Sequence, residues 1–111
     1  MEINRDDYVN VTDALKRIGG SMDLYKRLLK QFTGGDHISP LEEALSTGAV
    51  EDATRLIHTL KGVAANLSLV KLSTIAGELE HKVKSGAEHS ETFEELKNAY
   101  YITSQQIAEI S

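Results

Sequence analysis

The sequence predicts an all-α protein, an antiparallel four-helix bundle with one or two short accessory helices. Two observations support this fold class. Apolar residues recur at steps of three and four in five or six segments, and no segment alternates with the period of two that a strand would show. Because the connections between these segments are short, neighbouring helices should run antiparallel. We expect the four longest helices to form the core.

Composition indicates one domain spanning residues 1–111, with 41% apolar and 26% charged residues. The chain has no cysteine, which excludes disulfides and thiolate metal sites. A formal net charge of −5 without a basic stripe argues against nucleic acid as a partner. No apolar run approaches the roughly 18 residues of a membrane span, so we expect a cytoplasmic protein without direct membrane contact.

The first half of the chain contains the clearest stop and start signals. Residues 1–9 are expected to be extended or partly ordered. Asn10 should cap a short helix over residues 11–18, which Gly19-Gly20 terminates and which covers one end of the bundle. Ser21 should cap the next helix, and Gly34-Gly35 should end it.

A second start signal follows within residues 21–47. Ser39 and Glu42 have the spacing of a capping box, and Pro40 suits the first helical position. Residues 21–47 are therefore predicted to form two helices, with a single kinked helix as the alternative.

The second half of the chain is predicted to form three long helices. The first runs from Ala49 to about Leu67, and Ser85-Gly86 closes the second. A capping box at Thr92 and Glu95 should start the third. The apolar stripe of the first consists of Val50, Ala53, Ile57, Leu60, Ala64 and Leu67. The inner faces of the other two consist of Leu72, Ile75, Ala76, Leu79 and Val83, and of Phe93, Leu96, Tyr100, Thr103, Ile107 and Ile110.

His58 lies on the far side of its helix from the apolar stripe, at roughly 160° when each residue advances about 100°. The imidazole should therefore point to solvent. The residues that share this side are polar or small, namely Glu51, Thr54, Lys61, Gly62 and Ala65. We predict that Thr54, Gly62 and Ala65 form a docking surface around His58.

Gly62 is an unfavourable residue in the middle of a helix, where it costs about 1 kcal/mol relative to alanine. It leaves bare backbone one turn from His58, where a partner can approach closely. Lys61 brings a positive charge and three N–H donors within reach of a group attached to His58. Together these residues have the properties of a phosphoryl-accepting site on a docking face.

Three other functions must be weighed against a phosphoryl-accepting site. A kinase that phosphorylates His58 from ATP would need a glycine-rich phosphate loop after a strand, which the sequence lacks. A metal-carboxylate bundle is suggested by Glu78 and His81, but such sites need this motif on two helices and further inward glutamates, so we assign no metal ligands. A helical interaction adaptor, with an incidental solvated His58, is the remaining alternative.

The run from Leu56 to Leu67, with Leu72 and Leu79-Glu80, closely resembles the histidine-containing phosphotransfer (HPt) domain of two-component phosphorelays. The run from Leu15 to Gly20 matches the N-terminal half of the same family, together with Tyr25, Leu28-Leu29 and Phe32. The resemblance spans roughly residues 10–85. Because several separated landmarks agree in order and spacing, it is far more specific than the His58 motif alone.

The resemblance implies a four-helix bundle that carries phosphoryl groups without an ATP site or catalytic turnover of its own. By position, His58 is the phosphorylated residue, Lys61 stabilises the phosphoryl group, and Gly62 makes room for the partner. The implied partners are receiver domains of response regulators, and a hybrid sensor histidine kinase is a further candidate. No cofactor is implied for this chain, because Mg²⁺ is expected on the receiver domain.

Two positions depart from the family pattern. Ser68 stands where the family commonly has glycine, and we expect Ser68 to cap the following helix instead. The break between Gly34-Gly35 and Ser39-Pro40 interrupts what is often one continuous helix.

Overall fold

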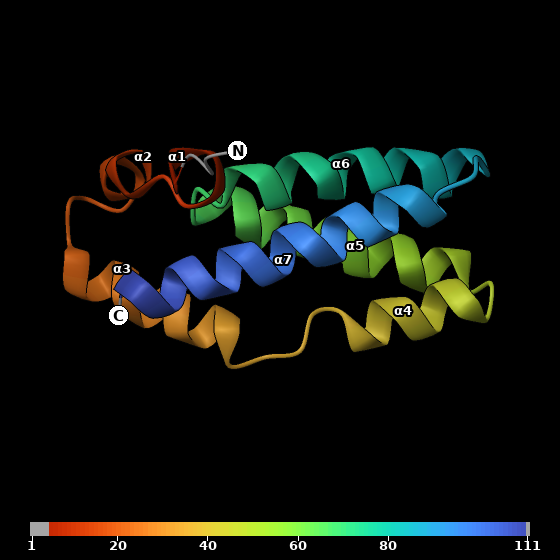
Figure 1. Ribbon diagram of the computed structural model, residues 1–111, viewed down its shortest axis with the longest axis horizontal. Helices are drawn as coiled ribbons and strands as arrows, with labels where there is room; N and C mark the ends of the chain where they lie inside the picture. The colour runs from red at the N-terminus through yellow and green to blue at the C-terminus, as the bar shows by residue number, and fades with distance from the viewer. Residues whose placement is uncertain (1–4, 111) are drawn as a thin grey trace.

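Residues 5–110 are described by a computed structural model, in which α-helices follow one another from end to end (Figure 1). These helices are α1 (Arg5–Tyr8), α2 (Val11–Arg17), α3 (Met22–Thr33), α4 (Ser39–Ser46), α5 (Val50–Asn66), α6 (Val70–Ser85) and α7 (Ser90–Ile110). The described residues contain no strand. The predicted all-α class is therefore confirmed.

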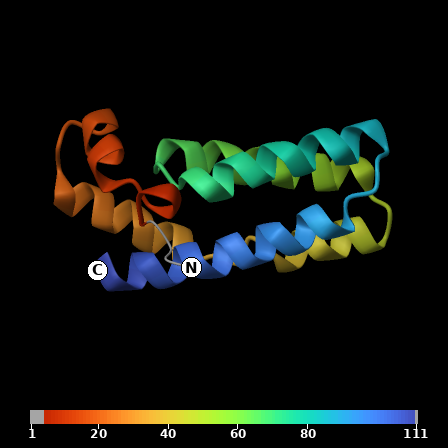
Figure 2. The ribbon, with the colours of Figure 1, turned by 45° about the horizontal axis from the view of Figure 1, so that its top comes forward.

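Four rods run antiparallel along the long axis of the molecule, as Figures 1 and 2 show. α5, α6 and α7 form one rod each, and α3 and α4 follow one another along the fourth. α1 and α2 are the accessory helices, and they cover the end of the bundle where α5 turns into α6. The predicted four-helix bundle thus contains one rod made of two helices.

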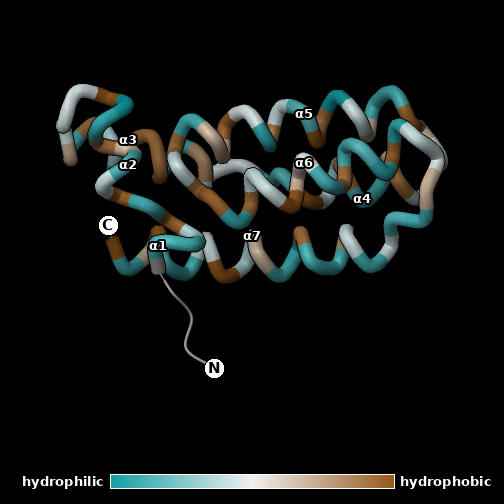
Figure 3. Tube along the Cα trace, turned by 90° about the horizontal axis from the view of Figure 1, so that it is seen from above, coloured by the Kyte–Doolittle hydropathy of each residue, from teal (hydrophilic) through white to brown (hydrophobic). Residues whose placement is uncertain are grey.

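Apolar residues alternate with polar residues along each helix, as Figure 3 shows, and the apolar ones pack into one core. The largest fully buried side chains come from all four rods: Tyr25, Leu29, Leu41, Ile57, Leu69, Leu72, Leu79, Leu96, Thr103 and Ile107. Most of the predicted α5 stripe is buried, but Val50 is 52% exposed. The prediction was wrong there because Val50 begins α5 at the end of the bundle, where no helix covers it.

Aromatic side chains stabilise the segment that connects α3 to α4. The rings of Phe32 and His37 stack with their centroids 4.5 Å apart, and His37 Nε2 bonds to the carbonyl oxygen of Phe32 at 2.9 Å. The Tyr100 hydroxyl donates to the carbonyl oxygen of Gly35 at 3.3 Å. α7 therefore fixes the connection, which confirms that residues 21–47 form two helices rather than one.

Caps were predicted correctly at the first two helices after residue 10. Asn10 accepts from the Asp13 amide at 3.0 Å, and Ser21 accepts from the Leu24 amide at 3.1 Å. Gly19 and Gly20 follow α2 with φ of 79° and 86°, in the left-handed region.

Two predicted capping boxes were wrong, because acidic side chains preceding the helices accept the free amides instead. At α4, Asp36 Oδ1 accepts from the amides of Ile38 and Ser39, both at 3.0 Å, and Ser39 is already helical. At α7, Glu88 Oε1 accepts from the Ser90 amide, and Thr92 is buried inside the helix. Residues 5–8 also differ from expectation, because they form the helical turn α1 instead of an extended segment. Residues 1–4 lie outside the described part.

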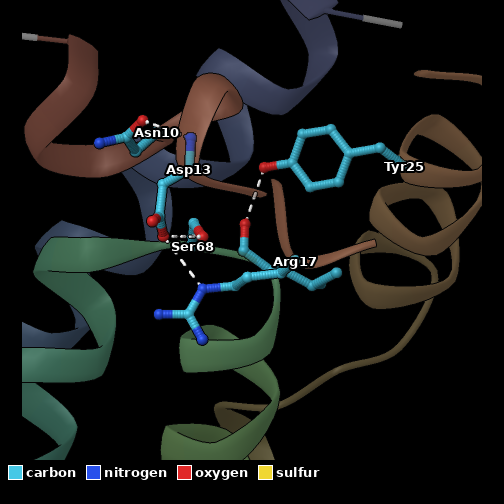
Figure 4. Close-up of polar contacts among 6 residues, drawn as sticks. Asn10, Asp13, Arg17, Tyr25 and Ser68 are labelled. Carbon is cyan, nitrogen blue, oxygen red and sulfur yellow. Dashed lines mark hydrogen bonds and ion pairs between the residues drawn. The ribbon is translucent and has the colours of Figure 1, made fainter. Parts of the chain in front are cut away.

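Ser68 adopts a left-handed conformation, with φ of 56°, in the turn between α5 and α6. The expectation that it caps α6 was wrong, since its hydroxyl donates to Asp13 Oδ2 at 2.7 Å (Figure 4). That bond and the bond from Arg17 Nε at 3.0 Å hold the pKa of Asp13 below its usual value. The carbonyl oxygen of Ser68 accepts from the Asn10 amide at 3.0 Å. The turn is therefore bound to α2, which offsets the cost of a left-handed serine.

A second bond fastens the same turn to α3. Tyr25 is fully buried, and its hydroxyl donates to the carbonyl oxygen of Leu67 at 2.7 Å (Figure 4). Burial raises the pKa of Tyr25 to about 12, so the phenol keeps its proton and remains a donor at neutral pH.

We expect Tyr25→Phe to lower the free energy of unfolding by about 1–3 kcal/mol, because it leaves a buried carbonyl oxygen without its donor. Tyr101→Phe is the matched control, since Tyr101 is 61% exposed and its hydroxyl bonds only to the exposed Gln105 side chain among the described contacts. Urea unfolding of both variants measures the difference. Equal stability of the two variants would show that the Tyr25 bond contributes nothing.

Candidate functional site

His58 lies on the outer side of α5, and 70% of its side chain is exposed. Ile57 and Leu60, which precede and follow His58 in the sequence and belong to the inner stripe, are 0% and 2% exposed. The helix therefore presents the imidazole to solvent while its opposite side enters the core. The predicted orientation of His58 is confirmed.

A buried carboxylate from the neighbouring helix contacts His58. Glu80 of α6 has only 8% of its side chain exposed, and its Oε2 lies 3.0 Å from His58 Nδ1. Lys61 Nζ donates to the other oxygen, Oε1, at 2.8 Å. Lys84 Nζ lies 3.6 Å from Oε2. One carboxylate thus connects three side chains from two helices.

Glu80 is ionised in spite of its burial. The hydrogen bond from Lys61 holds the pKa of this carboxyl below its usual value, although burial acts in the opposite direction. The bond to His58 and the charges of Lys61 and Lys84 add to the lowering. At neutral pH Glu80 is therefore a carboxylate, which can only accept hydrogen bonds.

This hydrogen bond determines the tautomer of His58. Because the carboxylate only accepts, Nδ1 carries the proton, and in the neutral ring Nε2 then keeps a free lone pair. The arrangement matches the way in which an aspartate orients the histidine of a hydrolase triad. The site therefore presents an oriented nitrogen nucleophile on an exposed side chain.

Two glycines near His58 have different surroundings. A Cβ at Gly77 of α6 would lie 3.5 Å from Lys61 Cδ, so the stem of Lys61 crosses α6 at this residue. A Cβ at Gly62 would meet nothing within 4 Å. The stem of Lys61 thus passes beside Gly77 on its way to Glu80, whereas Gly62 leaves an open surface beside His58, as predicted.

The other predicted docking residues lie in two separate hollows. Thr54 is half-buried in the groove that contains His58, which is lined by Val50, Glu51, Thr54, Arg55, His58, Thr59, Glu80 and Lys84. Ala65 is exposed and lines a different hollow near Ser68. The docking role of Thr54, Gly62 and Ala65 stays a prediction.

Sequence reasoning missed Glu80 and Lys84 as site residues. Glu80 is 22 residues from His58, so its place beside the imidazole depends on how α5 packs against α6. One signal was present: Glu80 follows Leu79 directly and adjoins the apolar stripe of its helix. A carboxylate at such a boundary is expected to need a cationic partner.

The part of the chain that the structure describes contains no group of three or more His, Cys, Asp or Glu side chains placed to hold a metal ion. Glu78 and His81, the pair considered for a metal-carboxylate site, are both exposed on α6.

Within residues 5–110, no helix has the length and apolar character needed to cross a membrane.

Comparison with protein families gives one match. The family model described as "Hpt domain" matches residues 28–106, from α3 into α7, and includes His58, Lys61, Gly62 and Glu80. The N-terminal run from Leu15 to Gly20, which also resembles this family, lies outside the matched residues. Searches of curated proteins and of solved structures gave no match.

We expect Glu80→Gln to lower stability near neutral pH, and this loss should shrink as the pH falls. The folded-state pKa of Glu80 is lowered, so its contribution is present above the unfolded-state pKa and disappears as the pH falls through the folded-state value. Urea unfolding between pH 7 and pH 3 measures this trend. Glu78→Gln, which removes an exposed carboxylate from the same helix, is the control. A Glu80→Gln deficit that persists unchanged at pH 3 would contradict the role of ionisation.

Proposed function

This chain belongs to the Hpt domain family, and on that premise we propose that it is a phosphorelay carrier. Members of this family have a role in histidine phosphotransfer. In this proposal His58 accepts a phosphoryl group from an aspartate of a receiver domain and passes it to another receiver domain. The observation that carries the proposal is the exposed imidazole of His58 with its Nδ1–H bonded to the carboxylate of Glu80.

This geometry supports the following transfer step. The Nε2 lone pair of His58 attacks phosphorus, a P–N bond forms, and the P–O bond to the donor aspartate breaks, which returns that aspartate as a carboxylate. Because Nδ1 keeps its proton, the phosphorylated ring carries a positive charge. The Glu80 carboxylate, 3.0 Å from Nδ1, stabilises that charge as it develops. The reverse step passes the group to the second receiver.

Lys61 acts in two ways in this proposal. Its bond to Glu80 Oε1 at 2.8 Å keeps the carboxylate ionised and in place. An ammonium group has three N–H donors, so others can turn toward the phosphoryl oxygens on His58. Lys84, whose side chain is 59% exposed, adds positive charge beside Glu80 Oε2, the oxygen that contacts His58.

The receiver domain supplies the remaining machinery. It would supply a Mg²⁺ ion, held in its acidic pocket, to offset the negative charge of the transferring group, whereas this chain supplies the nucleophile. The chain therefore acts as an intermediate without ATP binding or turnover of its own. Its partners are receiver domains in the cytoplasm, including that of a hybrid sensor histidine kinase. The receiver domains dock on a surface formed by Thr54, Gly62 and Ala65. A Cβ at Gly62 would meet nothing within 4 Å, so a partner can approach closely there.

We expect His58→Gln to abolish phosphorylation by a phosphorylated receiver and to leave the fold intact. The side chain is 70% exposed, and substitutions at such positions usually change the free energy of unfolding by less than about 0.5 kcal/mol. Loss of the hydrogen bond to Glu80 lowers the free energy of unfolding further. His81→Gln, at an exposed histidine of α6, is the matched control and should label normally. Acid-labile phosphate and the melting temperature are measured on the same preparations.

Phosphate retained by His58→Gln would overturn the assignment of the phosphorylated residue. If wild-type protein takes no phosphate from a panel of phosphorylated receivers, or from the small donor phosphoramidate, the carrier function itself is wrong. The helical adaptor would then be the better interpretation.

We expect Gly62→Gln to obstruct receiver docking without lowering stability. A side chain at this position meets nothing within 4 Å, and glutamine raises helix propensity relative to glycine. Transfer from the receiver should slow while labelling by phosphoramidate stays normal. Asn98→Gln, at an exposed position of α7, is the control. A large fall in melting temperature for Gly62→Gln would place Gly62 in the core, and an unchanged transfer rate would refute its docking role.

A further inference from the structure

Val50 is an apolar residue left in an exposed position next to the His58 groove. Among the described residues, the large apolar side chains that are exposed belong to Val50, Val70 and Tyr101, at 52%, 42% and 61%. Val50 and Val70 are the first residues of α5 and α6, so they lie at opposite ends of this antiparallel helix pair.

An apolar hollow lies beside Val50, at the end of the bundle where α4 turns into α5 and α6 into α7 (Figure 1). Its volume is about 120 Å³, close to the roughly 150 Å³ of an apolar cavity that takes up benzene. Its floor includes Ala53 and Val83, which are 1% and 5% exposed. The complete lining is Ala44, Leu45, Gly48, Val50, Ala53, Val83, Gly86, Ala87 and His89. His89 is the one titratable residue in that lining, so the hollow suits an uncharged, apolar group.

Val50 is also a wall of the groove that contains His58. The two residues are eight positions apart on α5, which corresponds to about 12 Å at a rise of about 1.5 Å per residue. A transient protein interface of about 1,200 Å² in total covers about 600 Å² of each partner, a disc of roughly 14 Å radius. A receiver centred on His58 therefore reaches Val50, which lines both the groove and the hollow.

We propose that the receiver domain that docks on His58 inserts an apolar side chain into the hollow beside Val50. This inference rests on the carrier function proposed above and specifies how the partner is held. The groove around His58 contains the charged residues Glu51, Arg55 and Lys84, whereas the hollow has none in its lining apart from His89. The charged groove contacts the phosphoryl group and the polar part of the receiver around it. The hollow binds an apolar side chain of the receiver.

The opposite end of the same helix pair does not offer this anchor. Val70 precedes Glu80 by ten positions, about 15 Å along α6, and thus lies at the edge of the footprint. The hollow beside it is lined by the charged residues Asp13 and Arg17, and Ala65 is the one proposed docking residue that it includes. Val70 therefore provides a control matched to Val50 in residue type, exposure and helical position.

The test compares Val50→Ser with Val70→Ser in transfer from a phosphorylated receiver. Both changes are neutral and lie at the first position of a helix, so neither introduces a charge near His58. We expect Val50→Ser to raise the half-saturating receiver concentration about three- to tenfold, with an unchanged maximal rate, and Val70→Ser to change it less than twofold. Ala87→Phe, which places an aromatic ring of the chain itself at the rim of the hollow, should weaken docking in the same way.

Labelling by phosphoramidate and the melting temperature are measured for each variant, because both should match wild type if only docking is affected. Equal half-saturating concentrations for Val50→Ser, Ala87→Phe and wild type would overturn the proposal, as would equal weakening by Val70→Ser. A wild-type protein that accepts phosphate from phosphoramidate and receivers, but whose hollow variants dock normally, refutes the anchor alone. A wild-type protein that accepts phosphate from neither refutes the carrier function.

Discussion

The buried carboxylate of Glu80 is the interaction on which the site depends. A charge with 8% of its side chain exposed is stable only when it is paired, and Glu80 accepts from Lys61 at 2.8 Å and from His58 at 3.0 Å. Both donors belong to α5 and the acceptor belongs to α6, so the bonds also fix the two helices against each other. The same contacts that satisfy the carboxylate orient the imidazole and leave its Nε2 nitrogen free.

Glycine and lysine positions around the site follow from this requirement. The stem of Lys61 passes Gly77 on its way to Glu80, and a Cβ at this residue would lie in van der Waals contact with it. Gly62 has the opposite surroundings, because nothing lies above it. One glycine therefore serves the interior of the site and the other its exterior, although both reduce the helix propensity of their segments.

The sequence predicted what depends on local periodicity and missed what depends on packing between helices. The exposure of His58 and Gly62 follows from positions along one helix, so the apolar stripe of α5 was sufficient to place them. Glu80 lies 22 residues after His58 in the sequence, and no local sequence pattern predicts that the two side chains come into contact. Val50 fits the stripe by spacing, but it lies where the bundle ends and no helix covers it.

Helix ends show the same division. Asn10 and Ser21 cap their own helices, as a local motif should. Thr92 instead accepts from Lys82 of α6, and Ser68 donates to Asp13 of α2, so tertiary contacts replaced the expected caps. A left-handed serine is tolerated at residue 68 because its hydroxyl and carbonyl groups both have partners on the accessory segment. That compensation comes from residues more than 50 positions away and cannot be read from the turn itself.

The two ends of the α5–α6 pair therefore differ in polarity, and the surface around His58 lies between a polar end and an apolar end. At the α5–α6 turn, Asp13, Arg17 and Ser68 form a polar network that joins the turn to α2. At the other end, Val50 is 52% exposed and borders an apolar hollow. In the docking proposed above, a partner centred on His58 gains apolar burial at Val50 by extending toward this end, whereas the polar groups of the α5–α6 turn already use their donors and acceptors internally. In the docking proposed above, an asymmetric face of this kind would orient the receiver on the bundle, so that its aspartate meets His58 from one side of the groove.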